Sequence, residues 1–201
     1  MLYWLANLKE EGKYMIRKVK HEEIPELYPF VLRILSDMEL PVLDEISEEL
    51  LEDIIVNAMH SPHYRYGYEH AWVCERDGRI AGVFFGYPGE WEALIDGPLR
   101  ASMLKFDYPM EPTPKENETL PGEWYLDTLV THPDFRRQGV GREMIEAACE
   151  IAKEAGYEII ALNCDIENEA AYRLYKKMGF KRKTRLVLSE HVYWHMTKEL
   201  E

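Results

Sequence analysis

One stretch of the chain combines a hydrophobic strand, a glycine turn and an amphipathic helix within about thirty residues. Residues 124–130 have the apolar character of a central strand, and Pro133 ends it because proline cannot donate a hydrogen bond to a strand ladder. The turn at residues 136–141 holds two arginines and two glycines, and residues 141–155 then place apolar side chains along one helical face, up to a glycine stop at Gly156. This order of elements requires a fold in which a helix N-terminus faces the end of a strand.

The turn is suited to hold an anion. The first N–H groups of a helix lack intrahelical partners, and the positive end of the helix dipole lies beside them. Glycines let an anion approach the backbone, while arginines add positive charge that reaches further oxygens. The residues that we expect to hold a phosphate or pyrophosphate are Arg136, Arg137, Gln138, Gly139, Val140, Gly141 and Arg142.

Two familiar phosphate-binding designs do not fit these residues. A P-loop requires lysine followed by serine or threonine at the helix start, where this chain has Arg142 and Glu143. A dinucleotide-binding glycine pattern requires a glycine where Met144 stands. The turn therefore needs a third explanation.

The segment Arg136-Arg137-Gln138-Gly139-Val140-Gly141 resembles the coenzyme A pyrophosphate loop of the GNAT superfamily of N-acetyltransferases: arginine or glutamine, two residues, glycine, one residue, glycine or alanine. Residues 168–180 resemble a second family signature, with an asparagine, an alanine, a leucine-tyrosine pair and a glycine-phenylalanine pair in order. The resemblance extends from about Met15 to the C-terminus and is strongest from Glu123 to Phe180.

The resemblance implies an α+β fold with a mixed, mostly antiparallel central sheet flanked by helices. Two central parallel strands, residues 124–130 and 157–163 here, splay apart to admit the pantetheine arm of acetyl-CoA, the implied co-substrate. The implied coenzyme contacts are Leu129 and Val130 through their backbone, the loop from Arg136 to Arg142, and Asn168, Ala171 and Tyr175.

The same resemblance assigns Tyr175 as the general acid that protonates the coenzyme A sulfur; the alternative is an aromatic side chain on a packed helix face. For a general base or an anchor of the ammonium group, Glu123 and Asp127 share strand parity and point to one face. We favour Asp127, whose alternative role is a strand carboxylate bonded to a neighbouring turn.

Histidine and cysteine offer further candidates. The last strand places three side chains on one face: His191, Tyr193 and His195. The two histidines either shuttle protons near the acyl group or are exposed residues of an edge strand. No spacing indicates a metal site. The three cysteines, Cys74, Cys149 and Cys164, are odd in number and lie in apolar surroundings, which indicates buried thiols in a reducing, cytoplasmic compartment.

The remaining pattern predicts one domain over residues 1–201. Strands are expected at 14–20, 70–76 and 79–87, the last two joined by an Asp77-Gly78 hairpin; helices at 22–38, 47–60 and 168–178; short helices at 91–95 and 99–106; and a final hairpin of strands 182–188 and 191–196. Residues 1–14 form an N-terminal extension, either an appended helix or a stretch outside the native product. Residues 90–122 form an insertion that is either a substrate lid or a surface loop.

The net charge of the chain favours some classes of binding partner over others. The chain has 24 basic and 37 acidic residues, a net charge of −13, which opposes nucleic acid as a main partner and is compatible with a cationic substrate. The sequence has no long uncharged apolar run, so it does not predict a membrane span.

The sequence thus predicts an enzyme that transfers an acetyl group from acetyl-CoA directly to a primary amine of a small, cationic molecule, without a metal. Two alternatives stay open: a protein N-terminal or lysine acetyltransferase, and a non-catalytic acyl-CoA sensor. The acceptor and the oligomeric state, for which a homodimer is one option, are not fixed by the sequence.

Overall fold

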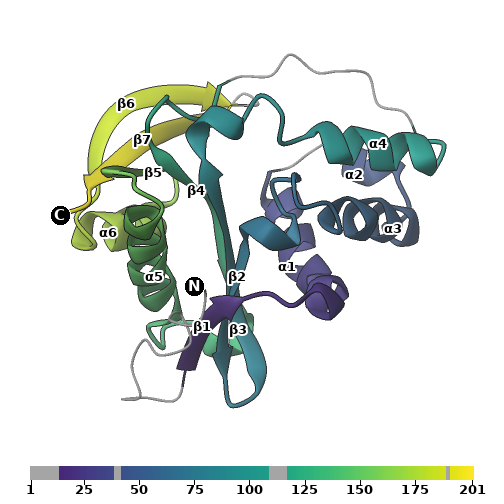
Figure 1. Ribbon diagram of the computed structural model, residues 1–201, viewed down its shortest axis with the longest axis horizontal. Helices are drawn as coiled ribbons and strands as arrows, with labels where there is room; N and C mark the ends of the chain where they lie inside the picture. Colours follow the sequence, from purple (N-terminus) through teal and green to yellow (C-terminus); the bar gives the residue numbers. More distant parts are fainter. Residues whose placement is uncertain (1–13, 39–41, 109–116, 189–190) are drawn as a thin grey trace.

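The computed structural model describes residues 14–38, 42–108, 117–188 and 191–201. Within these ranges seven strands form one sheet, and helices cover both of its faces (Figure 1). Of the predicted N-terminal extension only Tyr14 is described, and it opens the first strand. Residues 109–116 of the predicted insertion also lie outside the described residues.

The sheet has the strand order β1-β2-β3-β4-β5-β7-β6. All neighbours are antiparallel except β4 and β5, which confirms the predicted mixed, mostly antiparallel sheet with one parallel central pair. The strands are β1 Tyr14–Lys18, β2 Ala71–Arg76, β3 Arg79–Pro88, β4 Trp124–Thr131, β5 Ile159–Asp165, β6 Lys181–Leu188 and β7 His191–Glu199.

The helices divide between the two faces of the sheet, with α1 and α3 on one and α5 and α6 on the other (Figure 1). The α-helices are α1 Ile24–Asp37, α2 Val42–Glu45, α3 Glu48–Met59, α4 Gly97–Lys105, α5 Val140–Glu154 and α6 Glu169–Lys177. Short 3-10 turns are η2 His21–Glu23, η3 Tyr68–His70, η4 Gly89–Trp91 and η5 Pro133–Phe135. The helix predicted at residues 91–95 is wrong: η4 ends at Trp91, and α4 begins at Gly97.

Strand β3 shows why the sheet has two cores. Phe84 packs toward α5, whereas Val83 and Phe85 pack toward α1 and α3, because successive side chains of a strand point to opposite faces. All three are fully buried. Burying each side chain stabilises the fold by roughly 1.5–3 kcal/mol. Strand β3 therefore contributes to the stability of the cores on both faces of the sheet.

The two parallel strands separate soon after they meet. β4 and β5 pair only through Trp124 with Ile160 and Tyr125 with Ala161. On its other side β4 has a bulge, since Phe85 pairs with Thr128 and Gly86 with Leu126, so that Asp127 is the extra residue. The splay begins next to this bulge, which lies at the centre of the sheet.

Candidate active site

The turn before α5 presents free backbone donors. Gly139 is the N-cap of α5 and has a φ of 90°, a left-handed conformation that a side chain disfavours. The N–H groups of residues 140–142 lie in the first helical turn, where no intrahelical acceptor exists, and no other acceptor in the described part of the chain takes them. Such a set of donors is able to bind an anion.

Arg76 of β2 braces this turn from outside. Its guanidinium donates to the carbonyl of Gln138 at 3.1 Å and to the carboxylate of Glu143 at 2.9 Å. The Gln138 side chain donates to the carbonyl of Asp134 at 2.7 Å. Sequence reasoning missed Arg76, because its contacts lie more than sixty positions further along the chain.

The predicted arginines of the turn are placed at its surface. Arg136, Arg137 and Arg142 are exposed, and Arg142 pairs with Glu146 at 3.0 Å, one helical turn away. Arg137 has a φ of 61°, a left-handed conformation that is uncommon for a residue with a side chain. Their exposure lets the side chains of Arg136 and Arg137 reach a ligand from solvent, and Arg142 can do so by exchanging its surface partner Glu146.

The splayed edge of β4 lies beside this turn. Leu129 and Val130 pair with Phe84 and Val83 of β3, while the opposite edge of β4 has already parted from β5. An extended ligand can add to such an open edge as a further strand does. A Cβ on Gly141 would lie 3.7 Å from Leu129, so the turn and the splayed edge are in contact.

Helix α6 places the second predicted set of residues. Asn168 is the N-cap and accepts a hydrogen bond from the N–H of Ala171 at 3.0 Å, which confirms the predicted cap. Tyr175 packs edge-on against Phe180, with ring centroids 6.0 Å apart. Burial raises the pKa of its phenol above the ordinary value, so the hydroxyl keeps its proton at neutral pH.

Cys164 of β5 is close enough to Tyr175 to raise the pKa of that phenol further. Burial raises the pKa of the Cys164 thiol itself to about 11, so it is a thiol rather than a nucleophilic thiolate at neutral pH. All three cysteines are free and buried, as the sequence predicts.

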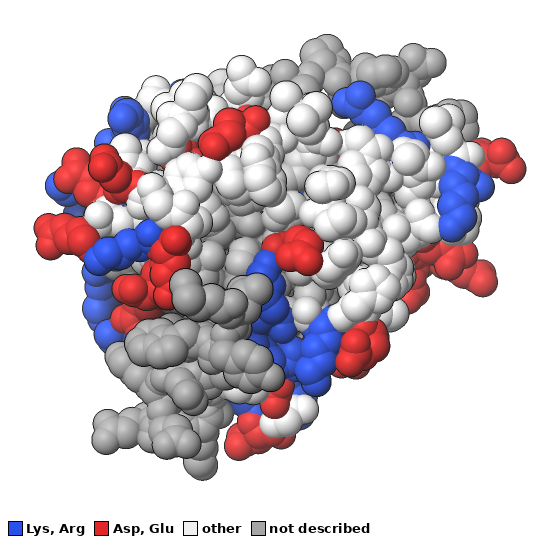
Figure 2. Space-filling model, viewed as in Figure 1, with Lys and Arg blue, Asp and Glu red and all other residues white. Residues whose placement is uncertain are grey.

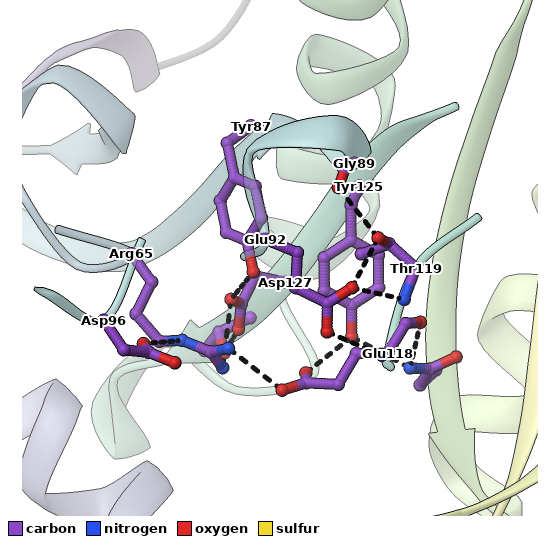
Figure 3. A network of polar contacts seen from close by, with 11 residues as sticks. Arg65, Tyr87, Gly89, Glu92, Asp96, Glu118, Thr119, Tyr125 and Asp127 are labelled. Carbon is purple, nitrogen blue, oxygen red and sulfur yellow. Dashed lines mark hydrogen bonds and ion pairs between the residues drawn. The ribbon is translucent and has the colours of Figure 1, made fainter. Parts of the chain in front are cut away.

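A pocket of about 400 Å³ opens on the α1 side of the sheet, next to the splay. Its walls come from α1, from the segment around Tyr64 to Tyr66, from both splayed strands and from the β6–β7 hairpin. Asp96 and Glu118 of the predicted insertion line it as well. Figure 3 shows a network of polar contacts that includes the lining residues Arg65, Asp96, Glu118, Tyr125 and Asp127.

Arg65 is the hub of this polar group. Its guanidinium lies 2.9 Å from Asp96, 2.9 Å from Glu118 and 3.4 Å from Asp127 (Figure 3). Burial alone would lower the pKa of Arg65, but Asp127, Tyr87 and Glu118 outweigh it and hold that pKa above its ordinary value. Arg65 is therefore a permanent cation inside the pocket.

Asp127 is the buried carboxylate of the splayed strand. Tyr87 donates to it at 2.7 Å and Thr128 at 2.9 Å, and its side chain is only 4% exposed. Burial raises the pKa of Asp127, although Arg65 opposes that shift. A carboxylate with a raised pKa is a better proton acceptor, and the role of Asp127 as a base stays a prediction.

Glu123 lies on the same face but away from the pocket lining. It accepts from the N–H of Leu120 at 2.7 Å and lies 3.2 Å from Nε2 of His195. Asn163 joins this pair to the pocket, because His195 Nδ1 lies 2.8 Å from its Oδ1 and its Nδ2 donates to Tyr125 at 3.0 Å. Glu123 thus contacts the pocket lining only indirectly, through His195 and Asn163.

The last strand corrects one expectation. An exposed edge is wrong for His195, because β7 lies between β5 and β6 and His195 is completely buried. His191 lies at the pocket rim, 3.7 Å from Asp165, so the two histidines have different surroundings.

Arg65 and Glu118 are two of the pocket residues that sequence reasoning missed. Arg65 stands between Tyr64 and Tyr66, and an arginine inside an aromatic run is a weak signal for a buried ion pair. Glu118 lies in a stretch whose main signals are prolines and polar residues. In the structure Glu92 fixes this stretch by accepting from the N–H groups of Glu118 and Thr119 at 2.7 and 3.1 Å (Figure 3).

A family model and two solved structures that resemble this chain all describe acetyltransferases. A family model described as the acetyltransferase (GNAT) family matches residues 31–180. A crystal structure described as an acetyltransferase has 42% sequence identity and a TM-score of 0.84, covering 93% of this chain and 100% of that chain. An N-acetyltransferase from Staphylococcus aureus Mu50 has 27% identity and a TM-score of 0.78, covering 91% and 99%.

More distant structures share the fold alone. The NatC complex bound to Gag peptide and CoA has 16% identity and a TM-score of 0.53, covering 94% of this chain and 100% of that chain. No curated protein matches the chain. Among the described helices none is long and apolar enough to cross a membrane, and the described His, Cys, Asp and Glu side chains form no group of three that could hold a metal ion.

Proposed function

The chain belongs to the GNAT family of acetyltransferases and is an N-acetyltransferase; on that premise we propose that it moves the acetyl group of acetyl-CoA directly onto a primary amine of a small molecule. The pocket beside the splayed strands carries this proposal. It has a volume of about 400 Å³, within the range of small-molecule sites, and brings Asp127 to the edge where β4 and β5 part.

The coenzyme has a defined place in this proposal. The pyrophosphate lies against the free N–H groups of residues 140–142, with Gly139 and the exposed Arg136, Arg137 and Arg142 around it. The pantetheine arm extends along the open edge at Leu129 and Val130, toward Asn168, Ala171 and Tyr175 on α6. Gln138 and Val140 complete the turn.

The chemistry requires two proton transfers. An alkylamine with a pKa of roughly 10 is mostly protonated at neutral pH, so it must lose a proton before its nitrogen attacks the thioester carbonyl. Asp127 accepts that proton, directly or through water. As the carbon–sulfur bond breaks, the Tyr175 hydroxyl gives its proton to the sulfur, and a backbone N–H near Val130 stabilises the oxyanion.

A small molecule is favoured over a protein segment by the way the insertion is held. Glu92 fixes residues 118 and 119, Asn163 donates to the carbonyl of Glu118 at 2.9 Å, and Glu118 pairs with Arg65. This part of the insertion therefore forms a wall of the pocket, which narrows the groove that an extended peptide would need. We also propose a cytoplasmic location, which the three free, buried cysteines support.

The test is consumption of acetyl-CoA by the purified protein with polyamines, amino acids, aminoglycosides and short peptides, with products identified by mass. The Tyr175→Phe variant is measured alongside. We expect transfer to one class of small amine, and a loss of about 10²-fold or more in kcat for the variant with nearly unchanged acetyl-CoA affinity, because only the proton donor is removed.

Each contrary result is specific. Wild-type turnover by Tyr175→Phe removes Tyr175 from the mechanism. Transfer to peptides alone favours a protein acceptor. Saturable acetyl-CoA binding with no transfer to any amine favours a coenzyme A sensor.

A further inference from the structure

Among its described lining residues, the acceptor pocket has more acidic than basic side chains. Three carboxylates, Asp96, Glu118 and Asp127, surround the single guanidinium of Arg65. The only other described titratable base on its lining is His191, which already lies near Asp165. α1 contributes only apolar side chains to the lining. Among the described residues of this lining, carboxylates therefore outnumber guanidinium groups.

Arg65 is not available to bind a negative ligand group. Its Nε pairs with Asp96, its Nη2 pairs with Glu118, and its Nη1 lies 3.4 Å from Asp127, so each nitrogen already contacts a carboxylate. A ligand carboxylate placed here would meet three like charges in a partly buried site, which is strongly unfavourable. An acceptor that uses Arg65 to hold its own acid group is excluded on these grounds.

Glu118, in contrast, can accept further donors. An ionised carboxylate offers about four lone-pair sites, whereas Glu118 has two protein partners here, Arg65 at 2.9 Å and the hydroxyl of Tyr125 at 3.2 Å. Its side chain is 22% exposed and faces the pocket (Figure 3). Tyr193 lies close enough to Glu118 for that carboxylate to raise the pKa of its phenol, after burial and Asp165. A ligand ammonium near Glu118 would gain both a carboxylate and an aromatic ring.

From the position of Asp127 at the splay and the open lone pairs of Glu118 in the same pocket, we infer that the acceptor is a dication: a small aliphatic diamine or polyamine in which one nitrogen is acetylated and another remains an ammonium group. The reacting nitrogen lies near Asp127, at the splay, and the second cationic centre lies on the Asp96 and Glu118 side of the pocket. The inference rests on the proposed function and specifies its substrate class.

Three acceptors of equal length test the inference. Butylamine, 1,4-diaminobutane and 4-aminobutanoate share one primary amine and a four-carbon spacing, but their far ends are neutral, cationic and anionic. We expect kcat/KM to be about tenfold or more higher for the diamine than for butylamine, since one charge-assisted hydrogen bond supplies such a factor, and lowest for the amino acid.

The variant Glu118→Gln tests the residue itself, since it removes a charge and keeps the shape. We expect kcat/KM for the diamine to fall about tenfold more than kcat/KM for butylamine, because only the diamine has a second ammonium group to lose its partner. The exposed Glu154→Gln on α5 removes the same charge far from the pocket and should change neither value. Acetyl-CoA affinity and circular dichroism show that the variants are folded. If Glu118→Gln does not fold, the comparison of the three acceptors with the wild-type protein still decides the inference.

The inference is overturned if wild-type protein uses butylamine and the diamine equally, if it prefers 4-aminobutanoate, or if the wider panel identifies an acceptor with a single cationic centre. It is also overturned if Glu118→Gln lowers both amines by the same factor. The proposed function fails separately, when no amine of any kind is acetylated.

Discussion

A single backbone angle controls the coenzyme turn. Gly139 has a φ of 90°, and alanine in this region costs roughly 1–2 kcal/mol. Replacing Gly139 by alanine should therefore lower the free energy of unfolding by about that amount. It should also weaken acetyl-CoA binding, because the turn relaxes and its N–H groups no longer point to one place. Urea unfolding and a coenzyme titration measure the two effects.

Gly156 supplies the matched control. It has a φ of 87° just after α5, a Cβ there would meet nothing within 4 Å, and it is far from the coenzyme turn. Gly156→Ala should cost similar stability and leave acetyl-CoA affinity unchanged. If both alanine variants bind acetyl-CoA as wild type does, Gly139 has no special role in holding the coenzyme.

The residue scale also shows the limit of strand parity. Parity groups Glu123 with Asp127, but β4 begins only at Trp124, and the two carboxylates have different surroundings: Asp127 lines the pocket, whereas Glu123 lies next to His195. The bulge that makes Asp127 the extra residue of β4 arises from pairing with β3. No local pattern in residues 124–130 encodes such a bulge. The sequence therefore indicates both carboxylates as candidates but does not predict which of them lines the pocket.

At the scale of elements, one arginine joins the edge of the sheet to the start of α1. Arg17 of β1 donates to both carboxylate oxygens of Glu23 in η2, each at 2.7 Å, and to Glu75 of β2 at 2.8 Å. The hydrogen bonds from Arg17 hold the pKa of Glu23 below its ordinary value of 4.5. The three elements thus share one ion-pair network.

This depressed pKa fixes the sign of a pH effect. The stabilisation is present above the unfolded pKa near 4.5 and is lost as pH falls through the lower folded pKa. Glu23→Gln should reduce the free energy of unfolding by about 1–2 kcal/mol at pH 7, and the difference from wild type should shrink between about pH 5 and about pH 3.

Urea unfolding at several pH values measures this difference. Glu52→Gln, at an exposed position in the middle of α3, is the control for loss of a charge. A constant difference between wild type and Glu23→Gln from pH 7 to pH 3 would contradict the ion-pair account.

Elements with strong local signals are the ones that the sequence predicts well. The Asp77-Gly78 hairpin, the Asn168 cap and the amphipathic α5 each depend on neighbouring residues, and the structure confirms all three. The position of β7 inside the sheet depends instead on contacts with β5 that are distant in sequence. The Arg65 network has the same origin, since its partners come from separate elements 31 to 62 positions away. Local periodicity carries no information on such pairs.

At the scale of the whole molecule, the net charge of −13 creates a field that attracts cations. Figure 2 shows acidic and basic side chains mixed over one face, with acidic groups spread toward both ends rather than gathered in one patch. Such a distribution gives a weak attraction at long range. The strong attraction belongs to the pocket, where carboxylates outnumber guanidinium groups three to one around Arg65.

This division predicts how salt affects catalysis. Raising the ionic strength from about 0.01 M to about 0.1 M shortens the Debye length from about 30 Å to about 10 Å, so the long-range part of the attraction is screened. With acetyl-CoA saturating at both salt concentrations, kcat/KM for 1,4-diaminobutane should fall roughly threefold or more. Butylamine carries half the charge and should lose less.

The preference for the diamine should nevertheless persist at high salt, because Glu118 and Asp96 are partly buried and lie close to the bound ammonium, where salt screens poorly. Steady-state rates for both amines at several salt concentrations separate the two contributions. A preference that vanishes at about 0.1 M salt would place the discrimination in the field of the whole surface and not in the pocket. A kcat/KM for the diamine that is independent of salt would show that the net charge has no part in capturing it.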